Sequence, residues 1–227
     1  MKKIKLLITL SAICTSSLIY AQDHLAPSTM KNPVADIHPD NSYLLEEALV
    51  YLKIGNKKVV EKDFHAAAEN YTKALEIKHN FKEALKNRGI CYTMMNMDEK
   101  AIQDFDHAII IDPDDKSLYS YRGFAKAEAK QFEEALKDLN IAISMDNKFS
   151  DAYMNKGIVY IWMGNFEAAI KEFDKIISFD PENGKAYYNR GIAYEELENI
   201  PRACIDWQKS LNLKYRLALE MVGTYCQ

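Results

Sequence analysis

The chain has 227 residues, of which 33 are acidic and 29 are basic, so its formal net charge is −4. Nucleic-acid binding relies on surfaces rich in Lys and Arg that neutralise phosphate, so the acidic balance argues against it. The length is ample for a continuous folded core without a metal.

The N-terminus has the layout of an export signal. Lys2, Lys3 and Lys5 are followed by an apolar run at residues 6–13, then by small and polar residues up to Ala21. This order is typical of a secretory signal peptide, and it is closer to bacterial signals than to eukaryotic ones. We therefore expect residues 1–21 to be cleaved and the protein to be exported, to the periplasm or outside the cell. An uncleaved anchor is the alternative, although the apolar run is short for a membrane span.

Cleavage after Ala21 changes the charge of the mature chain. The loss of Lys2, Lys3 and Lys5 leaves 26 basic residues against 33 acidic ones, a net charge of −7. That balance argues against docking on anionic lipid, so we expect no direct membrane binding. Residues 22–47 follow as a polar segment with three prolines up to residue 41, which predicts a flexible tether and a lead-in to the first helix.

A strict 34-residue period runs through the following part of the chain. Glycine marks one position of five consecutive copies, at Gly55, Gly89, Gly123, Gly157 and Gly191. Alanine marks a second position, at Ala67, Ala101, Ala135, Ala169 and Ala203. Such a period is the signature of a stacked-repeat protein, whose units bury their apolar faces only against their neighbours. We number each copy so that its glycine is the eighth residue.

Each copy predicts two amphipathic helices, because its apolar residues recur at three- and four-residue spacing. We expect the glycine to admit a close partner helix, with the periodic alanine as the opposing small face. In copies two to five, a basic seventh residue occurs together with an acidic twenty-third residue. This joint occurrence predicts an ion pair within each unit: Arg88 with Asp104, Arg122 with Asp138, Lys156 with Glu172, and Arg190 with Asp206.

The fourth copy carries a family pattern most clearly, at Tyr153, Lys156, Gly157, Tyr160, Ala169, Phe173 and Pro181. This pattern resembles the tetratricopeptide repeat, in which an aromatic-x₂-L-G-x₂-Y motif is followed by A, F and P. The resemblance covers residues 48–213 as five repeats, with 214–227 expected as a C-terminal capping helix. It implies an all-α fold, an α-solenoid of helix-turn-helix repeats in a right-handed superhelix. It also implies a concave groove that binds peptides or other proteins.

The resemblance assigns the groove to the first helix of each unit. The sixth residue there is often asparagine, whose amide can both donate to and accept from an extended peptide. The fifth, ninth and thirteenth residues are mostly apolar, and we expect several of them to be exposed as a binding band. Packing between the repeats is the alternative for each residue. The predicted binding residues are Asn87, Ile90, Met94, Tyr121, Phe124, Met154, Asn155, Ile158, Trp162, Tyr188, Asn189 and Ile192.

Three cysteines follow residue 21, an odd number for an oxidising compartment. If the tail folds back as an antiparallel helix, Cys204 and Cys226 reach similar heights on adjacent helices. Residues 203–207 and 225–226 also resemble the C-terminal closure of other exported bacterial repeat proteins. We therefore expect a disulfide between Cys204 and Cys226, with two unpaired thiols as the alternative. Cys91 is expected to be a plain core residue.

The sequence carries no catalytic motif. The five histidines occupy unrelated positions, no spacing predicts metal ligands, and there is no phosphate loop or G-x-S-x-G nucleophile. We therefore expect no enzyme, no metal and no cofactor, but a scaffold that binds a protein or peptide and no nucleic acid. The alternative is a self-assembling or structural subunit of a cell-envelope complex. A homo-oligomer would then form through the apolar cap, at Leu217, Leu219, Met221 and Val222.

Overall fold

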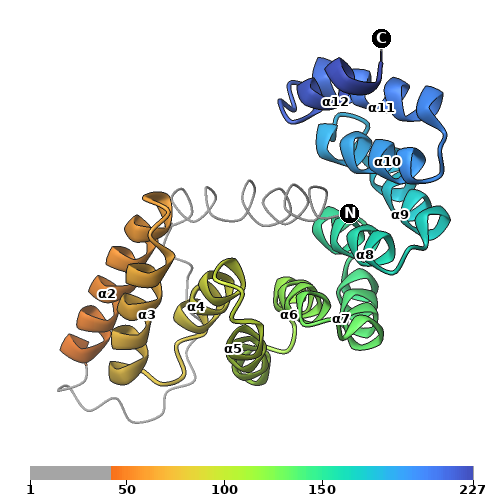
Figure 1. Cartoon of the computed structure of the whole chain (residues 1–227). Helices are drawn as coiled ribbons and strands as arrows, with labels where there is room; N and C mark the ends of the chain where they lie inside the picture. The colour runs from red at the N-terminus through yellow and green to blue at the C-terminus, as the bar shows by residue number, and fades with distance from the viewer. Residues whose placement is uncertain (1–41, 227) are drawn as a thin grey trace. The chain divides into compact units, whose positions relative to one another are not determined.

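The computed structural model describes residues 42–226, and every regular element among them is an α-helix. The first of these, labelled α2 in Figure 1, spans Ser42–Val60 and begins six residues before the first predicted repeat. The predicted signal peptide, residues 1–21, and the predicted tether up to residue 41 lie outside the described residues. The all-α class expected from the sequence is confirmed.

The chain divides into two compact units between Ala129 and Lys130. The N-terminal unit holds α2 and then α3 (Phe64–Ile77), α4 (Lys82–Met94), α5 (Asp98–Ile111) and α6 (Lys116–Glu128). The C-terminal unit holds α7 (Phe132–Met145), α8 (Ser150–Trp162), α9 (Phe166–Phe179), α10 (Gly184–Glu196), α11 (Ile200–Asn212) and α12 (Ala218–Tyr225). Within each unit, helices that follow one another along the chain pack side by side (Figure 1).

The turn between the two helices of a pair has the same backbone conformation throughout. The fifteenth residue of each copy has a positive φ, at Lys62, Asn96, Lys130, Gly164 and Glu198. This left-handed conformation ends the first helix, and it costs a residue other than glycine roughly 1–2 kcal/mol. The residue after it is the N-cap of the second helix. At Asp63, Asn165 and Asn199 its side chain accepts a hydrogen bond from the backbone N–H three residues later.

The repeated glycine makes room for an aromatic ring of its own helix pair. A Cβ atom added at the glycine would lie 2.5–2.8 Å from a ring atom, in the pairs Gly55–Tyr71, Gly89–Phe105, Gly157–Phe173 and Gly191–Trp207. The expectation that the periodic alanine opposes the glycine is therefore wrong. The alanines are fully buried elsewhere in the same interface, and the large ring at the twenty-fourth position fills the space beside the glycine.

The 34-residue period continues into the last helix. The first helices that precede it begin at Lys82, Lys116, Ser150 and Gly184, and α12 begins at Ala218, again 34 residues on. Tyr225 stands at the eighth position of α12, where the other units have glycine. Its ring packs on Trp207, with the ring centroids 5.4 Å apart. The helix α12 therefore stands in the register of a first helix, and it packs on α11.

A disulfide joins α11 to the end of α12. The sulfur atoms of Cys204 and Cys226 are bonded, and the two Cα atoms lie 5.5 Å apart. The link closes a loop that contains the turn after Leu213 and the whole of α12. Cys91 is buried and carries a free thiol.

Candidate protein-binding surface

The predicted binding residues of the N-terminal unit lie on α4 and α6. Asn87 donates from Nδ2 to Oδ1 of Asn56 over 3.0 Å, and the same oxygen accepts from the hydroxyl of Tyr71 over 2.8 Å. Burial raises the pKa of the Tyr71 hydroxyl, so this group remains a donor. The Tyr121 ring stacks on Phe105 at 5.8 Å between centroids. The polar contacts join α2, α3 and α4, and the aromatic contact joins α5 to α6.

The predicted binding residues of the C-terminal unit lie on α8 and α10. Asn189 is fully buried, and its Nδ2 donates to Lys185 O over 2.8 Å and to Met154 Sδ over 3.4 Å. Its Oδ1 is buried without a hydrogen-bond partner. The Tyr188 ring packs on Tyr215, and burial first, then Tyr215 and Glu220, raise its pKa to about 12. Asn189 therefore joins α10 to α8, and Tyr188 joins α10 to the turn before α12.

Burial divides the predicted residues into two sets. The larger set is buried, which contradicts the expected exposure, because these side chains pack between neighbouring helices: Ile90, Phe124, Met154, Asn155, Ile158, Tyr188, Asn189 and Ile192. The smaller set is half-buried and keeps accessible surface: Asn87, Met94, Tyr121 and Trp162. The apolar band is therefore narrower than the sequence predicts.

The regular spacing of charges produces ion pairs between the two helices of a unit. Three of the predicted pairs are present, at Arg88–Asp104, Lys156–Glu172 and Arg190–Asp206, over 2.7–3.0 Å. The fourth, Arg122 with Asp138, stays a prediction.

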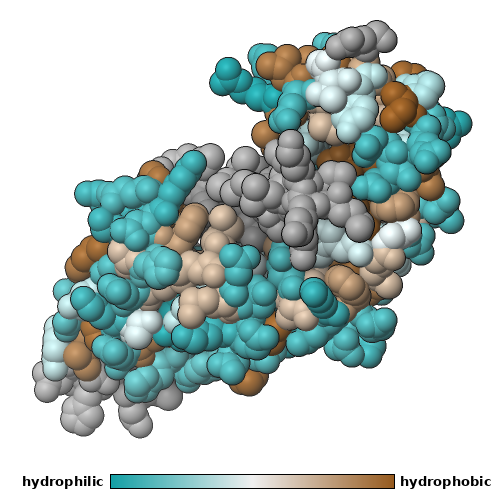
Figure 2. All heavy atoms as spheres, viewed as in Figure 1, coloured by the Kyte–Doolittle hydropathy of each residue, from teal (hydrophilic) through white to brown (hydrophobic). Residues whose placement is uncertain are grey.

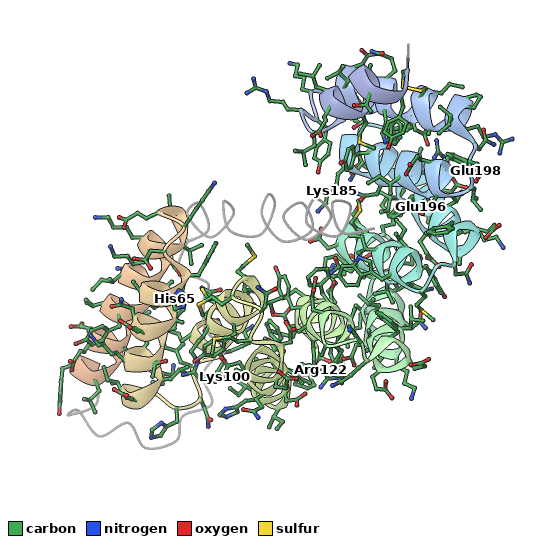
Figure 3. The ribbon with its side chains drawn as sticks, viewed as in Figure 1. His65, Lys100, Arg122, Lys185, Glu196 and Glu198 are labelled. Carbon is green, nitrogen blue, oxygen red and sulfur yellow. A yellow bond between two sulfur atoms is a disulfide. The ribbon has the colours of Figure 1, made fainter. Side chains whose placement is uncertain are left out.

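The cations at the seventh position also contact the second helix of the preceding unit. Arg88 donates to Thr72, Arg190 to Asp174, and Arg122 (labelled in Figure 3) to Asp106. The acceptor in each case is the twenty-fifth residue of its copy. These contacts were not predicted from the sequence, although their constant 16-residue separation is a signal that indicates them.

A shallow pocket of about 410 Å³ opens between α3 and the end of α4. Its lining combines Ala68, Tyr92, Met95 and Met97 with the polar residues His65, Glu69, Thr72, Lys73 and Glu76. Lys100, labelled with His65 in Figure 3, lies 5.6 Å from the centre of the Tyr92 ring. The repeat pattern gave no indication of this pocket.

Within residues 42–226, no cluster of three or more His, Cys, Asp or Glu side chains is arranged to hold a metal ion. The same part of the chain has no helix that is long and apolar enough to cross a bilayer. The pKa values of the buried Cys91 and of the half-buried Asp151 are also raised. Burial raises the pKa of Cys91 to about 12, and burial raises the pKa of the Asp151 carboxyl against the opposing charge of Lys185. The thiol of Cys91 is therefore protonated and unreactive.

Comparison with known proteins identifies the class. Family models of the tetratricopeptide repeat match residues 83–115, 150–183 and 172–205. The chain is 30% identical to MamA, a protein of known crystal structure, over 73% of this chain and 96% of MamA, with a TM-score of 0.58. A comparison with functionally curated proteins gave no match. The chain belongs to the tetratricopeptide repeat family.

Two more distant structures show the same fold. A thermophilic tetratricopeptide protein of Thermus thermophilus is 16% identical, with 77% of this chain and 99% of that chain covered and a TM-score of 0.67. A repeat protein of Parabacteroides merdae is 22% identical, with 73% and 64% covered and a TM-score of 0.66. The predicted α-solenoid fold is thus confirmed. Proteins of this family generally mediate interactions between proteins and are generally not catalytic.

Proposed function

We propose that this protein is a non-catalytic scaffold that binds a protein or peptide along its first helices. The observation that carries the proposal is the half-buried set Asn87, Met94, Tyr121 and Trp162. Each of these side chains is partly buried and keeps part of its surface accessible, and three of them are large and apolar or aromatic. Anchored aromatic and Met side chains with an adjacent amide are typical of protein-binding surfaces.

The arrangement of the repeats is part of the same proposal. Five repeats at 48–213 in a right-handed superhelix would place the first helices along a concave groove. The groove would take a segment of the partner, with the buried residues Ile90, Phe124, Ile158 and Ile192 as its supporting layer. The net acidic charge makes nucleic acid an unsuitable partner.

We further propose that the protein acts after export, in the periplasm or outside the cell. The support comes from the two ends of the chain. The N-terminal 21 residues have the charge and apolar order of a signal peptide, and Cys204 and Cys226 are paired as a disulfide. Disulfides persist in oxidising compartments and are rare in the cytosol.

A second candidate function is self-assembly through the C-terminal cap. Leu217 and Leu219 are exposed at 39% and 63%, as this candidate requires. Met221 is 9% exposed and Val222 is half-buried, which corrects the expectation that all four residues are available. The two remaining leucines form a small contact, so the scaffold function is the better supported of the two.

Site-specific photo-crosslinking in the native cell tests the proposal. The probe replaces Met94 in one variant and Trp162 in another, because both side chains are half-buried on first helices. The control places it at Lys171, which is exposed on the second helix α9. One dominant protein captured from Met94 and Trp162, but not from Lys171, supports the scaffold. Equal capture at all three sites contradicts it, and capture of the chain by itself favours self-assembly.

A further inference from the structure

The outer face of α2 differs from the matching face of the first helices that follow it. In α4, α6, α8 and α10 the third residue is completely buried, at Ala84, Leu118, Ala152 and Ala186, and the seventh is a cation. In α2 the same two positions are Val50 and Ile54, which are exposed at 53% and 39%. In the later first helices these two positions hold a buried residue and a cation. In α2 both are apolar and solvent-exposed.

Val50 and Ile54 belong to a stripe along α2. Tyr43 precedes Val50 by seven residues and is 55% exposed, so the three side chains lie on one face of the helix. The opposite face carries the buried Ala48 and Val59, which pack into the core. Figure 2 shows apolar side chains at the outer edge of α2, on a surface that is otherwise mostly hydrophilic. We call Tyr43, Val50 and Ile54 the α2 stripe.

The charges beside the stripe are arranged symmetrically about its centre. Glu46 and Glu47 lie on the N-terminal side, one on each flank of the stripe, and Lys57 and Lys58 lie likewise on the C-terminal side. The Lys57 side chain is 78% exposed. Glu61, just beyond the end of α2, lies 2.8 Å from Lys58 and 4.0 Å from Lys57. The midpoint of the four charged residues is Leu52, which is also the midpoint between Val50 and Ile54.

We propose that α2 forms an isologous interface with α2 of a second copy of this chain, the two helices running antiparallel. In this arrangement Val50 of each copy packs on Ile54 of the other. Glu46 and Glu47 then face Lys57 and Lys58 of the second copy on the same flanks. A single two-fold axis near Leu52 produces both the apolar contacts and the opposite-charge pairs. This self-complementarity is the reason to name a second copy as the occupant.

The expected dimer is weak. A 19-residue helix is about 28 Å long, and a single pair of such helices falls at the small end of specific interfaces. The flanking ion pairs are exposed, so they contribute to register and specificity more than to affinity. Association should therefore depend on protein concentration and on salt. It does not depend on the proposed binding surface, which lies on other helices.

Charge reversal tests this interface, because two variants that had merely unfolded would not form a specific heterodimer when mixed. One variant is Glu46→Lys with Glu47→Lys, and the other is Lys57→Glu with Lys58→Glu. Each variant alone places like charges opposite each other at every flank, so each should stay monomeric at concentrations where the natural chain dimerises. In a mixture of the two, all flanks become complementary and a heterodimer should form. Sedimentation velocity at low salt, with one variant labelled, measures this on chains purified with their mature N-terminus.

The matched control is Glu133→Lys with Glu134→Lys, which makes the same change of charge on exposed residues of α7. This control should dimerise like the natural chain. The proposal is overturned if the natural chain stays monomeric up to roughly 1 mM, or if its dimer persists unchanged in both reversed variants. It is also overturned if the mixture remains monomeric while melts show both variants folded. Loss of the dimer through Leu219→Lys alone would assign it to the cap instead.

Discussion

The Arg190 guanidinium of α10 donates two parallel hydrogen bonds to the Asp206 carboxylate of α11, each 2.7 Å long. The third nitrogen of the same group donates to Asp174 of α9. A single side chain thus holds its own helix pair together and links it to the preceding one. The two acids differ in burial, because the Asp206 side chain is 4% exposed and the Asp174 side chain is 50% exposed.

This difference predicts unequal effects of removing the two acids. Asp206→Ala leaves a largely buried guanidinium without its main partner and should destabilise the protein by roughly 3 kcal/mol. Asp174→Ala removes an exposed partner and should cost about 0–1 kcal/mol. Urea unfolding of both variants measures the difference. Equal losses would mean that burial does not decide the strength of these pairs.

The Gly191–Trp207 contact predicts a strong effect of one added methyl group. A Cβ at residue 191 would lie 2.5 Å from Trp207 Nε1, and this nitrogen is fixed by its bond to Tyr188 O. Gly191→Ala should therefore destabilise by roughly 1–3 kcal/mol. Gly223→Ala in α12 is the control, because a Cβ added there would have no atom within 4 Å apart from its chain neighbours and the backbone of its own helix. This control should stabilise by about 0.5–1 kcal/mol in a thermal melt.

The left-handed turn predicts a stabilising substitution. Glu198 has a φ of 58°, and glycine adopts this conformation without the steric penalty of a side chain. Glu198→Gly should raise the stability by up to about 1 kcal/mol. Gly164 occupies the same turn position with a φ of 76°, so Gly164→Ala should lower it by a similar amount. Opposite shifts of the melting temperature are expected, and shifts of one sign would contradict the explanation.

The disulfide predicts that one cysteine thiol is reactive, and that breaking the Cys204–Cys226 bond lowers the stability of the protein. Of the three cysteines after residue 21, only Cys91 is free in the structure, so one thiol should react under denaturing conditions without reductant. Three reactive thiols would show that the pair does not form. Cys204→Ser should destabilise the protein by about 3 kcal/mol in the chain-entropy model. The effect should disappear when variant and natural chain are compared in reductant.

The half-buried carboxyl of Asp151 predicts a dependence of stability on pH. Burial raises its pKa in the folded protein above 3.8, so the folded chain binds more protons than the unfolded chain in this range. Stability should fall as the pH rises from 3.8 through the folded pKa, and it should level off above that. Asp151→Asn cannot titrate and should flatten this part of the curve. Urea unfolding from about pH 3.5 to about pH 7 measures the stability of both chains. If Asp151→Asn leaves the pH dependence unchanged, Asp151 is not its source.

Sequence analysis predicted those features that the period itself encodes. The spacing of Arg88 and Asp104 was enough to predict their bond, because the two residues appear and disappear together among the copies. The absence of a cation at Ile54 marked the first repeat as different. The close helix contact at Gly191 was also predicted, because glycine recurs at this position in every copy. Its partner Trp207 was not identified, because spacing along a chain does not say which residue of the second helix comes nearest.

The binding surface was predicted less well for a related reason. The residues at the ninth position, such as Ile90 and Ile158, were expected to be exposed because of their register on the first helix. Register gives the direction of a side chain, but not the distance to the next helix, and that distance decides whether Ile158 is covered. The pocket at Tyr92 and Met95 combines α3 with the end of α4, so no single helical pattern could reveal it.

The pairing of Gly191 with Trp207 and of Arg190 with Asp206 has a consequence for the history of the chain. A duplicated stretch of 34 residues carries both members of each pair, so a new copy arrives with its packing and its charge already matched. Growth or loss of whole copies would then leave the neighbouring segments unchanged. Cys204, Tyr225 and Cys226 lack this property, because no other copy carries the same residues at the matching repeat positions. Copies should therefore be gained or lost between Phe81 and Asn183. The segment from Cys204 to Cys226 should not be duplicated with them.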